Sequence, residues 1–244
     1  MRRLVKILGF GALVMYFPVI LGFVSADRNN TVCNNIIAEV NDSVSNRFIS
    51  AYELKLLVLQ KYPGILGKNI NDVNTENMEH FFEKNPSIEN CEVYFSIGGA
   101  LHVEVKQKDP VLRVFEDPYH SYYLDDEGKK MPVSTKHTAH VLVANGYISR
   151  LKDRDELFRL AKFIKDDDFW RSQIEQIYVT SKGEIELIPR VGDHIVEFGT
   201  ADRMEKKFRN LKALYRNGWD AREWNVYKKV SLKYNGQIVC SKVR

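Results

Sequence analysis

Cysteine is scarce in this chain of 244 residues, and its three copies lie far apart. Cys33, Cys91 and Cys240 form neither a CxxC pair nor a zinc-ligand spacing. Three cysteines are also too few for a dense disulfide framework. A single bridge, for example between Cys33 and Cys91, stays open, but the pattern favours small, buried apolar thiols. The sequence therefore excludes a zinc module and a disulfide scaffold.

A strong excess of charge is also missing. The formal net charge is +4, from 36 basic and 32 acidic residues. Arg2, Arg3 and Lys6 are three of the 36 basic residues, so the rest of the chain has 33 basic against 32 acidic residues. A nucleic-acid-binding protein needs a basic face on its folded part. We therefore expect no nucleic-acid partner, and the 44% of hydrophobic residues indicates a globular protein.

Motifs of catalysis and cofactor binding are absent as well. The chain has no HExxH, GxSxG, GxGxxG or Walker A sequence. His137 and His140 lie three residues apart without the rest of a zinc motif, and the acidic run 125–128 lacks EF-hand spacing and is typical of a turn. Asp166–Asp168 is interpreted as a solvated turn. We predict no catalytic, metal-binding or cofactor-binding residues, and hence no enzyme.

What the chain does contain is a long uncharged segment near its start. Residues 7–26 include no charged side chain, and a helix of that length spans about 30 Å, the thickness of the hydrocarbon core. The basic residues before it predict a cytoplasmic tail (1–6), a single transmembrane helix (7–26) and an outer part beyond Ala26. A cleaved signal peptide is the alternative, because Val24-Ser25-Ala26 suits a peptidase. We favour the anchor, because the segment exceeds the usual apolar region of about 7–15 residues in a signal peptide.

The first outer domain is predicted to span residues 32–107 with the order β-α-α-β-β. Ser50 and Glu53 form a capping box for the first helix, and Asn74 or Thr75 can cap the second. Gly98-Gly99 joins the last two strands as a hairpin. The expected strands are 31–40, 88–97 and 101–107, and their sheet would carry both helices on one face.

The short stretch Lys108-Asp109-Pro110 separates two extended runs. Proline has no N–H for a central sheet ladder and biases Asp109 away from helix. We interpret this break as the boundary with a second domain, residues 110–242. Hairpins are predicted at 122–134 and 174–189, helices at 153–165 and 202–217, and extended segments at 194–199 and 230–241. The predicted fold class is α+β, with a mostly antiparallel β domain following the first domain.

Several of these stretches resemble the FtsQ (DivIB) family of bacterial cell-division proteins. "NPSIENCEVYFSIGGALHVEVKQKDPVLRVF" resembles the end of the family's POTRA domain and its join to the next domain. "YYLDDEGKKMPVS" resembles the first hairpin of the family's β domain, and "FGTADRMEKKFRNLKALY" and "KKVSLKYNGQIVCSK" resemble later parts of it. The ordered set covers nearly all of the outer part. The resemblance implies a POTRA domain followed by an FtsQ-type β domain in a single-pass inner-membrane protein, mostly periplasmic, at the division septum.

The family resemblance also implies partners. It implies a non-enzymatic divisome scaffold that binds FtsB- and FtsL-type bitopic proteins at its last strand and helps control septal peptidoglycan synthesis. An edge strand suits this role because it offers unpaired backbone groups to another chain. Tyr234 matches a tyrosine of the family's docking region. Lys233 stands where the family often has arginine, so the resemblance does not carry over a bidentate contact at that position. The further partner-binding residues are the neighbours Val230, Leu232, Gln237 and Val239.

Three other hypotheses stay open at this point. POTRA domains also occur in outer-membrane assembly and secretion components, but this chain is too short for a POTRA domain plus a membrane barrel. The second is a periplasmic or secreted enzyme with a cleaved leader, and the third is a plain periplasmic binding module. Retention of residues 1–26 and an assay for hydrolase activity would separate these from a divisome scaffold.

Overall fold

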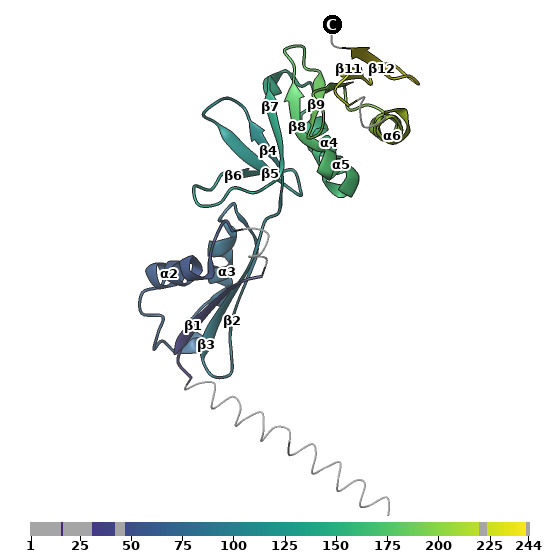
Figure 1. Cartoon of the computed structure of the whole chain (residues 1–244). Helices are drawn as coiled ribbons and strands as arrows, with labels where there is room; N and C mark the ends of the chain where they lie inside the picture. The colour runs from purple at the N-terminus through teal and green to yellow at the C-terminus, as the bar shows by residue number, and fades with distance from the viewer. Residues whose placement is uncertain (1–15, 17–30, 42–46, 220–223, 243–244) are drawn as a thin grey trace, which may run out of the picture. The chain divides into compact units, whose positions relative to one another are not determined.

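The computed structural model describes Tyr16 and residues 31–41, 47–219 and 224–242. It divides between Gln107 and Lys108 into two units, which are described separately (Figure 1). The predicted anchor, residues 7–26, lies outside the described residues except for Tyr16. Within the part that is described, no helix is both long enough and apolar enough to cross a membrane.

The first unit is a three-stranded sheet with two helices. Its strand order is β1-β3-β2, with β1 parallel and β2 antiparallel to the central β3. The predicted first strand is shorter than expected, because β3 begins only after the Gly98-Gly99 turn and Val32 forms just an isolated bridge with Asn69. The elements are β1 (Asn35–Val40), α2 (Ala51–Lys61), η1 (Ile70–Asp72), α3 (Thr75–Glu83), β2 (Ile88–Phe95) and β3 (Ala100–Gln107).

Local signals place both helices as the sequence predicts. The Ser50 side chain accepts from Glu53 N, and the Glu53 carboxylate accepts from Ser50 N, which completes the capping box. The Asn74 side chain caps α3 by accepting from Asn77 N. Both helices pack on one face of the sheet, through a core that includes Leu54, Val58, Met78, Phe82, Leu101, Val103 and Val105.

Two of the three cysteines belong to this first core. Cys33 and Cys91 are buried free thiols, and Cys240 is a half-buried free thiol in the second unit. Burial, with a smaller contribution from nearby glutamates, raises the pKa of the Cys91 thiol to about 12. A thiol with such a pKa stays protonated and acts as a small apolar side chain.

The opposite face of the first sheet carries an acidic row. Glu39 and Glu92 flank Glu104 directly on its two neighbouring strands. The Tyr94 hydroxyl donates to the Glu104 carboxylate, and this hydrogen bond is the main reason why the pKa of Tyr94 is raised. Like charges that face each other across strands destabilise a sheet.

Replacing Glu92 by lysine is therefore expected to raise the free energy of unfolding of the first unit by about 0.5 kcal/mol. The lysine would turn a repulsive cross-strand pair with Glu104 into an attractive one. Denaturant unfolding at low and at high salt measures the gain, which salt should reduce. The control Glu92→Gln removes only the repulsion and should gain less. Equal stability of all three proteins would contradict the prediction.

The second unit is built on one nine-stranded sheet. Its strand order is β12-β11-β10-β9-β8-β7-β4-β5-β6. The strands are β4 (Pro110–Phe115), β5 (Ser121–Asp125), β6 (Lys130–Pro132), β7 (Leu142–Gly146), β8 (Ile174–Val179), β9 (Ile185–Pro189), β10 (Ile195–Gly199), β11 (Tyr227–Ser231) and β12 (Val239–Lys242). The helical segments are η2 (Ile148–Arg150), α4 (Arg154–Asp166), α5 (Asp168–Gln173), α6 (Met204–Ala213) and the π-helical η3 (Leu214–Gly218).

This sheet is mixed, with five antiparallel and three parallel pairings. Parallel neighbours need a crossover connection. The helices α4 and α5 connect β7 with its parallel neighbour β8, and α6 lies between β10 and its parallel neighbour β11. The helices pack on one face of the sheet, where the centroid of the Phe208 ring lies 4.7 Å from that of Trp170 and 5.1 Å from that of Phe198.

Two details of this unit differ from the sequence interpretation. Asp167 is not part of a solvated turn: its carboxylate accepts from Phe169 N and Trp170 N and caps the short helix α5, which buries Trp170. The last helix begins at Met204, after Arg203 in a left-handed conformation (φ 49°), and widens into a π turn at Leu214. A helix as short as α5 and a single π turn are too brief to show the apolar periodicity by which helices are predicted.

The acidic turn between β5 and β6 has a structural role. Asp125 is buried, and its carboxylate accepts from Glu127 N at 3.1 Å and Lys129 N at 2.7 Å. Lys108 donates to the same carboxylate at 2.7 Å. The turn prediction is confirmed, and the first residue after the break at 107 is thereby fixed to the second unit.

A candidate docking edge at the C-terminal strands

The C-terminal hairpin forms one edge of the nine-stranded sheet. β11 lies between β10, to which it is parallel, and β12, to which it is antiparallel. β12 is the outermost strand, and no other strand in the described part of the chain pairs with its outer side. Backbone groups on that side are therefore available to a strand of another protein.

The structure divides the predicted partner-binding residues into two groups. Tyr234 is 56% exposed, Gln237 is exposed and Val239 is 41% exposed. Val230 and Leu232, in contrast, lie in the core. Side chains alternate along an extended chain, and Val230 in β11 and Leu232 just after it both point into the core under the helices. The surface available to a partner is thus the turn at Tyr234 and the edge strand β12.

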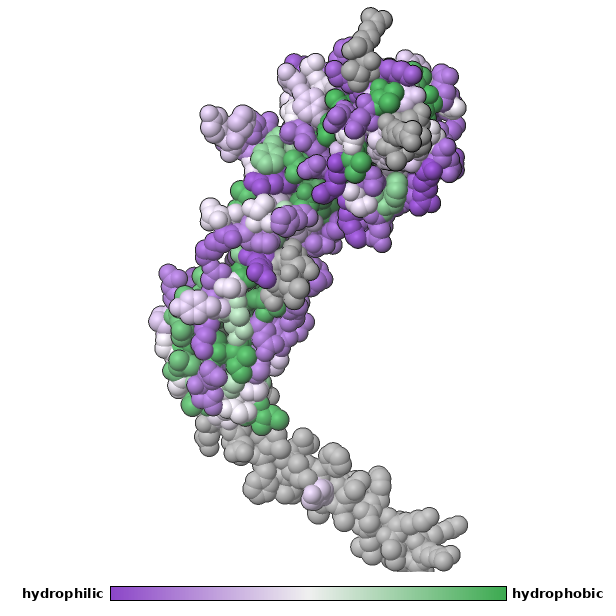
Figure 2. Space-filling model, in the orientation of Figure 1, coloured by the Kyte–Doolittle hydropathy of each residue, from purple (hydrophilic) through white to green (hydrophobic). Residues whose placement is uncertain are grey.

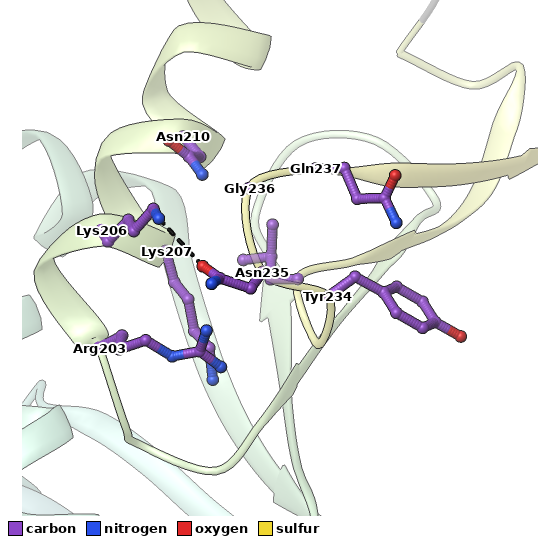
Figure 3. Close-up of a pocket in the computed structure, with 9 residues that line it drawn as sticks. Arg203, Lys206, Lys207, Asn210, Tyr234, Asn235, Gly236 and Gln237 are labelled. Atoms are coloured by element: carbon purple, nitrogen blue, oxygen red, sulfur yellow. Dashed lines mark hydrogen bonds between the residues drawn. The ribbon is translucent and has the colours of Figure 1, made fainter.

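The turn at Tyr234 is attached to the start of α6. Lys206 donates to the Asn235 side-chain oxygen at 3.0 Å, and Gly236 adopts a positive φ of 80° (Figure 3). The Tyr234 ring points away from the helix in the same view. A shallow hollow of about 10 Å³ lies between helix and turn, lined in part by Arg203, Lys206 and Tyr234. A cavity of this volume holds about one water molecule. It is therefore too small for a substrate, but a side chain of another protein can contact it.

Lys207 sets the position of this helix from inside the unit. Its side chain is only 7% exposed, although it lies in a run of basic residues. The ammonium group donates to Phe198 O at 3.0 Å, Thr200 O at 2.7 Å and the Asp202 carboxylate at 2.9 Å. The hydrogen bond from Lys207, with a further one from the Thr200 hydroxyl, holds the pKa of Asp202 well below its usual range. The end of β10 and the start of α6 are joined through one buried charge.

Lysines on the open face of the sheet are also paired within the chain. Lys233 donates to Glu184 at 2.6 Å, and this bond is the main reason why its pKa is raised. Lys229 donates to Glu197 at 3.0 Å, and this bond lowers the pKa of the carboxyl group.

The second unit also has a hollow away from the C-terminal strands. A larger hollow of about 540 Å³ lies at the ends of β4 and β7, next to Phe115, Asp117 and Tyr147. The Asp117 carboxylate is hydrogen-bonded to His120 at 2.7 Å. Among the residues that the structure describes, no three His, Cys, Asp or Glu side chains gather in a way that could hold a metal ion.

Sequence reasoning found the edge strand but missed the parts that hold it. The roles of Lys206 and Lys207 could not be told apart, because the two are neighbours in one basic run. No role was predicted for His194, whose ring is buried against Tyr215 and Trp219. An aromatic-rich segment, residues 215–227, was the available signal for that cluster.

The fold and the edge define a class of protein: a POTRA-like domain followed by a β domain with a free terminal strand. A model of the POTRA-like domain matches residues 31–106. The model described as FtsQ/DivIB, C-terminal related, matches residues 109–241, which is 133 of the 244 residues. The chain belongs to the FtsQ/DivIB family, a family of non-enzymatic scaffolds in bacterial cell division. No curated protein matches the chain.

Proposed function

We propose that this protein is a membrane-anchored divisome scaffold that binds FtsB- and FtsL-type bitopic proteins by strand addition to β12. The free outer side of β12 supports this most directly, because added strands gain affinity from backbone hydrogen bonds. The exposed Tyr234 and Val239 supply side chains for specificity beside that edge. Membership of the FtsQ/DivIB family supports interactions with other division proteins.

The anchor completes the proposal. Residues 7–26 would span the inner membrane once, with the short basic tail in the cytoplasm and both units in the periplasm. Partners that span the same membrane are held near β12 at a high effective concentration, so a short edge strand can suffice for binding. Through these partners the scaffold would help control septal peptidoglycan synthesis.

Photo-crosslinking tests the docking edge in the native host. A photoreactive phenylalanine at Tyr234 or Val239 is expected to give a crosslinked product whose added mass is that of a small single-span protein. The matched control is Tyr119, a 90% exposed tyrosine in the turn between β4 and β5, toward the other end of the sheet order. Equal yields at Tyr119 and Tyr234, or crosslinks to a copy of this chain alone, would remove β12 as the docking site.

A further inference from the structure

Residues 31–34 lie between two loops of the first unit. Cys33 N donates to Lys68 O at 2.8 Å, and Gly67 N donates to Cys33 O at 2.7 Å. On the other side, the Asn34 side chain donates to Gly98 O at 2.6 Å. We call the surface formed by residues 31–34, 65–68 and 96–99 the N-terminal pole.

Large apolar side chains point into solvent at this pole. Ile97 is 103% exposed, Leu66 is 49% exposed and Val32 is 44% exposed. These side chains contribute little to the core, although apolar residues of their size are usually buried. Figure 2 shows hydrophobic surface, in green, at the end of the first unit where the β2–β3 turn lies in Figure 1.

Charge is nearly absent from the same surface. Among the twelve residues of the pole, only Lys68 carries a charge, and it is positive. The turns at 125–130 and 181–184, in contrast, contain several charged side chains. An apolar surface with a single cationic side chain suits the boundary between headgroups and acyl chains of an anionic membrane.

The turn that carries Ile97 is fixed in place. Gly99 has a φ of 82°, and a Cβ at this position would collide with Val32 O. Asn34 N also donates to Gly99 O at 3.1 Å. Glycine thus allows the turn to pack closely against residues 31–34. Ile97 therefore has a fixed position beside these residues.

The sequence before the pole indicates what covers it. Thr31 follows the end of the predicted anchor, Ala26, by five residues. Five residues span at most about 18 Å when fully extended. A soluble partner is a poorer fit, because three side chains fall far short of the roughly 800 Å² per partner in a standard interface. The bilayer that holds the anchor lies within reach of the pole.

We propose that the N-terminal pole contacts the membrane, with Ile97, Leu66 and Val32 inserted into the interfacial region of the lipid bilayer. This inference rests on the membrane anchoring in the proposed function. The contact would fix the POTRA-like unit on the membrane surface at two places, the anchor and the β2–β3 turn.

Fluorescence quenching on the full chain tests this contact. One copy is inserted per nanodisc of phosphatidylethanolamine and phosphatidylglycerol, with a lipid spin-labelled near the top of its acyl chain. A fluorophore is attached to Ile97→Cys in a Cys240→Ser background, which removes the half-buried thiol. The matched control is Lys84→Cys, an exposed site before the start of β2 and thus about 25 Å from the turn. A third probe, Val14→Cys, reports on the anchor.

We expect quenching to be several-fold stronger at residue 97 than at residue 84. Because each nanodisc holds one copy, contact with a second copy cannot cause this difference. Quenching at 97 no stronger than at 84, while the probe at 14 is quenched, would overturn the membrane contact alone. Absence of quenching at 14 would overturn both the anchor and the contact, which separates the two failures.

Discussion

Replacing Lys207 by methionine is expected to lower the free energy of unfolding of the second unit by about 3 kcal/mol. Methionine keeps the length of the side chain but removes all three hydrogen bonds of the ammonium group. The carbonyl groups of Phe198 and Thr200 then lose their bonds to it, in a site that is nearly closed to water. Denaturant unfolding of the purified chain measures the loss.

The neighbouring lysine provides the matched control. Lys206→Met removes one hydrogen bond to Asn235 and should change stability by about 0.5 kcal/mol or less. A second readout is the pKa of Asp202, which should rise toward its ordinary value in Lys207→Met and stay low in Lys206→Met. Similar losses of stability in the two variants would mean that the buried charge is not what joins β10 to α6.

The same Lys207 variant bears on the docking edge. The start of α6 holds the Tyr234 turn through Lys206 and Asn235. Lys207→Met should loosen the start of α6 and therefore weaken crosslinking at Tyr234. Crosslinking at Tyr234 in Lys206→Met shows separately what the loss of the Lys206–Asn235 hydrogen bond does.

Acidification is expected to destabilise the second unit through His194. The ring is 1% exposed, and burial lowers its pKa to about 4, although the charge of Asp193 acts in the opposite direction. Its Nε2 atom is hydrogen-bonded to the Tyr215 hydroxyl at 2.7 Å, and Nδ1 finds no hydrogen-bond partner among the described residues. Protonation would place a charge among the rings of Trp219 and Trp224.

The direction of the effect follows from the two pKa values. An unfolded histidine has a pKa of about 6.5, so between pH 6.5 and pH 4 the unfolded state binds more protons than the folded state. The stability that His194 contributes is complete above pH 6.5 and falls as the pH decreases to 4, by about 3 kcal/mol in total.

Unfolding free energies measured between pH 7 and pH 4 check this expectation. His194→Phe keeps a ring in the cluster and should remove the part of the pH dependence that comes from His194. The Tyr215 hydroxyl loses its partner in this variant, which should lower the free energy of unfolding by the same amount at every pH. His120→Gln, which removes an exposed histidine beside Asp117, is the control and should change this slope less than His194→Phe does. Parallel curves for the original protein and His194→Phe would contradict a buried neutral histidine.

Local signals predicted most individual elements. The capping box at Ser50, the Asn74 cap and the glycine turn at Gly98-Gly99 depend on residues that are neighbours in the chain. The alternation from Leu101 to Gln107 likewise showed which side of β3 is buried. Residues close in sequence interact in the same way in most folds. Such patterns can therefore be interpreted without knowing which other helix or strand packs against them.

The candidate site was predictable only in part. Tyr234 and Val239 lie on the surface beside the free edge, as a docking role needs, whereas Val230 and Leu232 are core residues. Alternation alone could not separate the two groups, because it does not say which face of β11 the helices cover. The parallel pairing of β11 with β10 decides this, and that pairing joins residues more than thirty positions apart.

The sequence by itself determined the order of most elements, the break before Pro110 and the resemblance to a division family, because each depends on short-range patterns. Tertiary structure decided that β12 is the outermost strand, that Lys207 points inward while Lys206 points to the Asn235 turn, and that Ile97 lies beside the start of the unit. Burial and edge position are set by long-range packing and strand register, which no local pattern of side chains encodes.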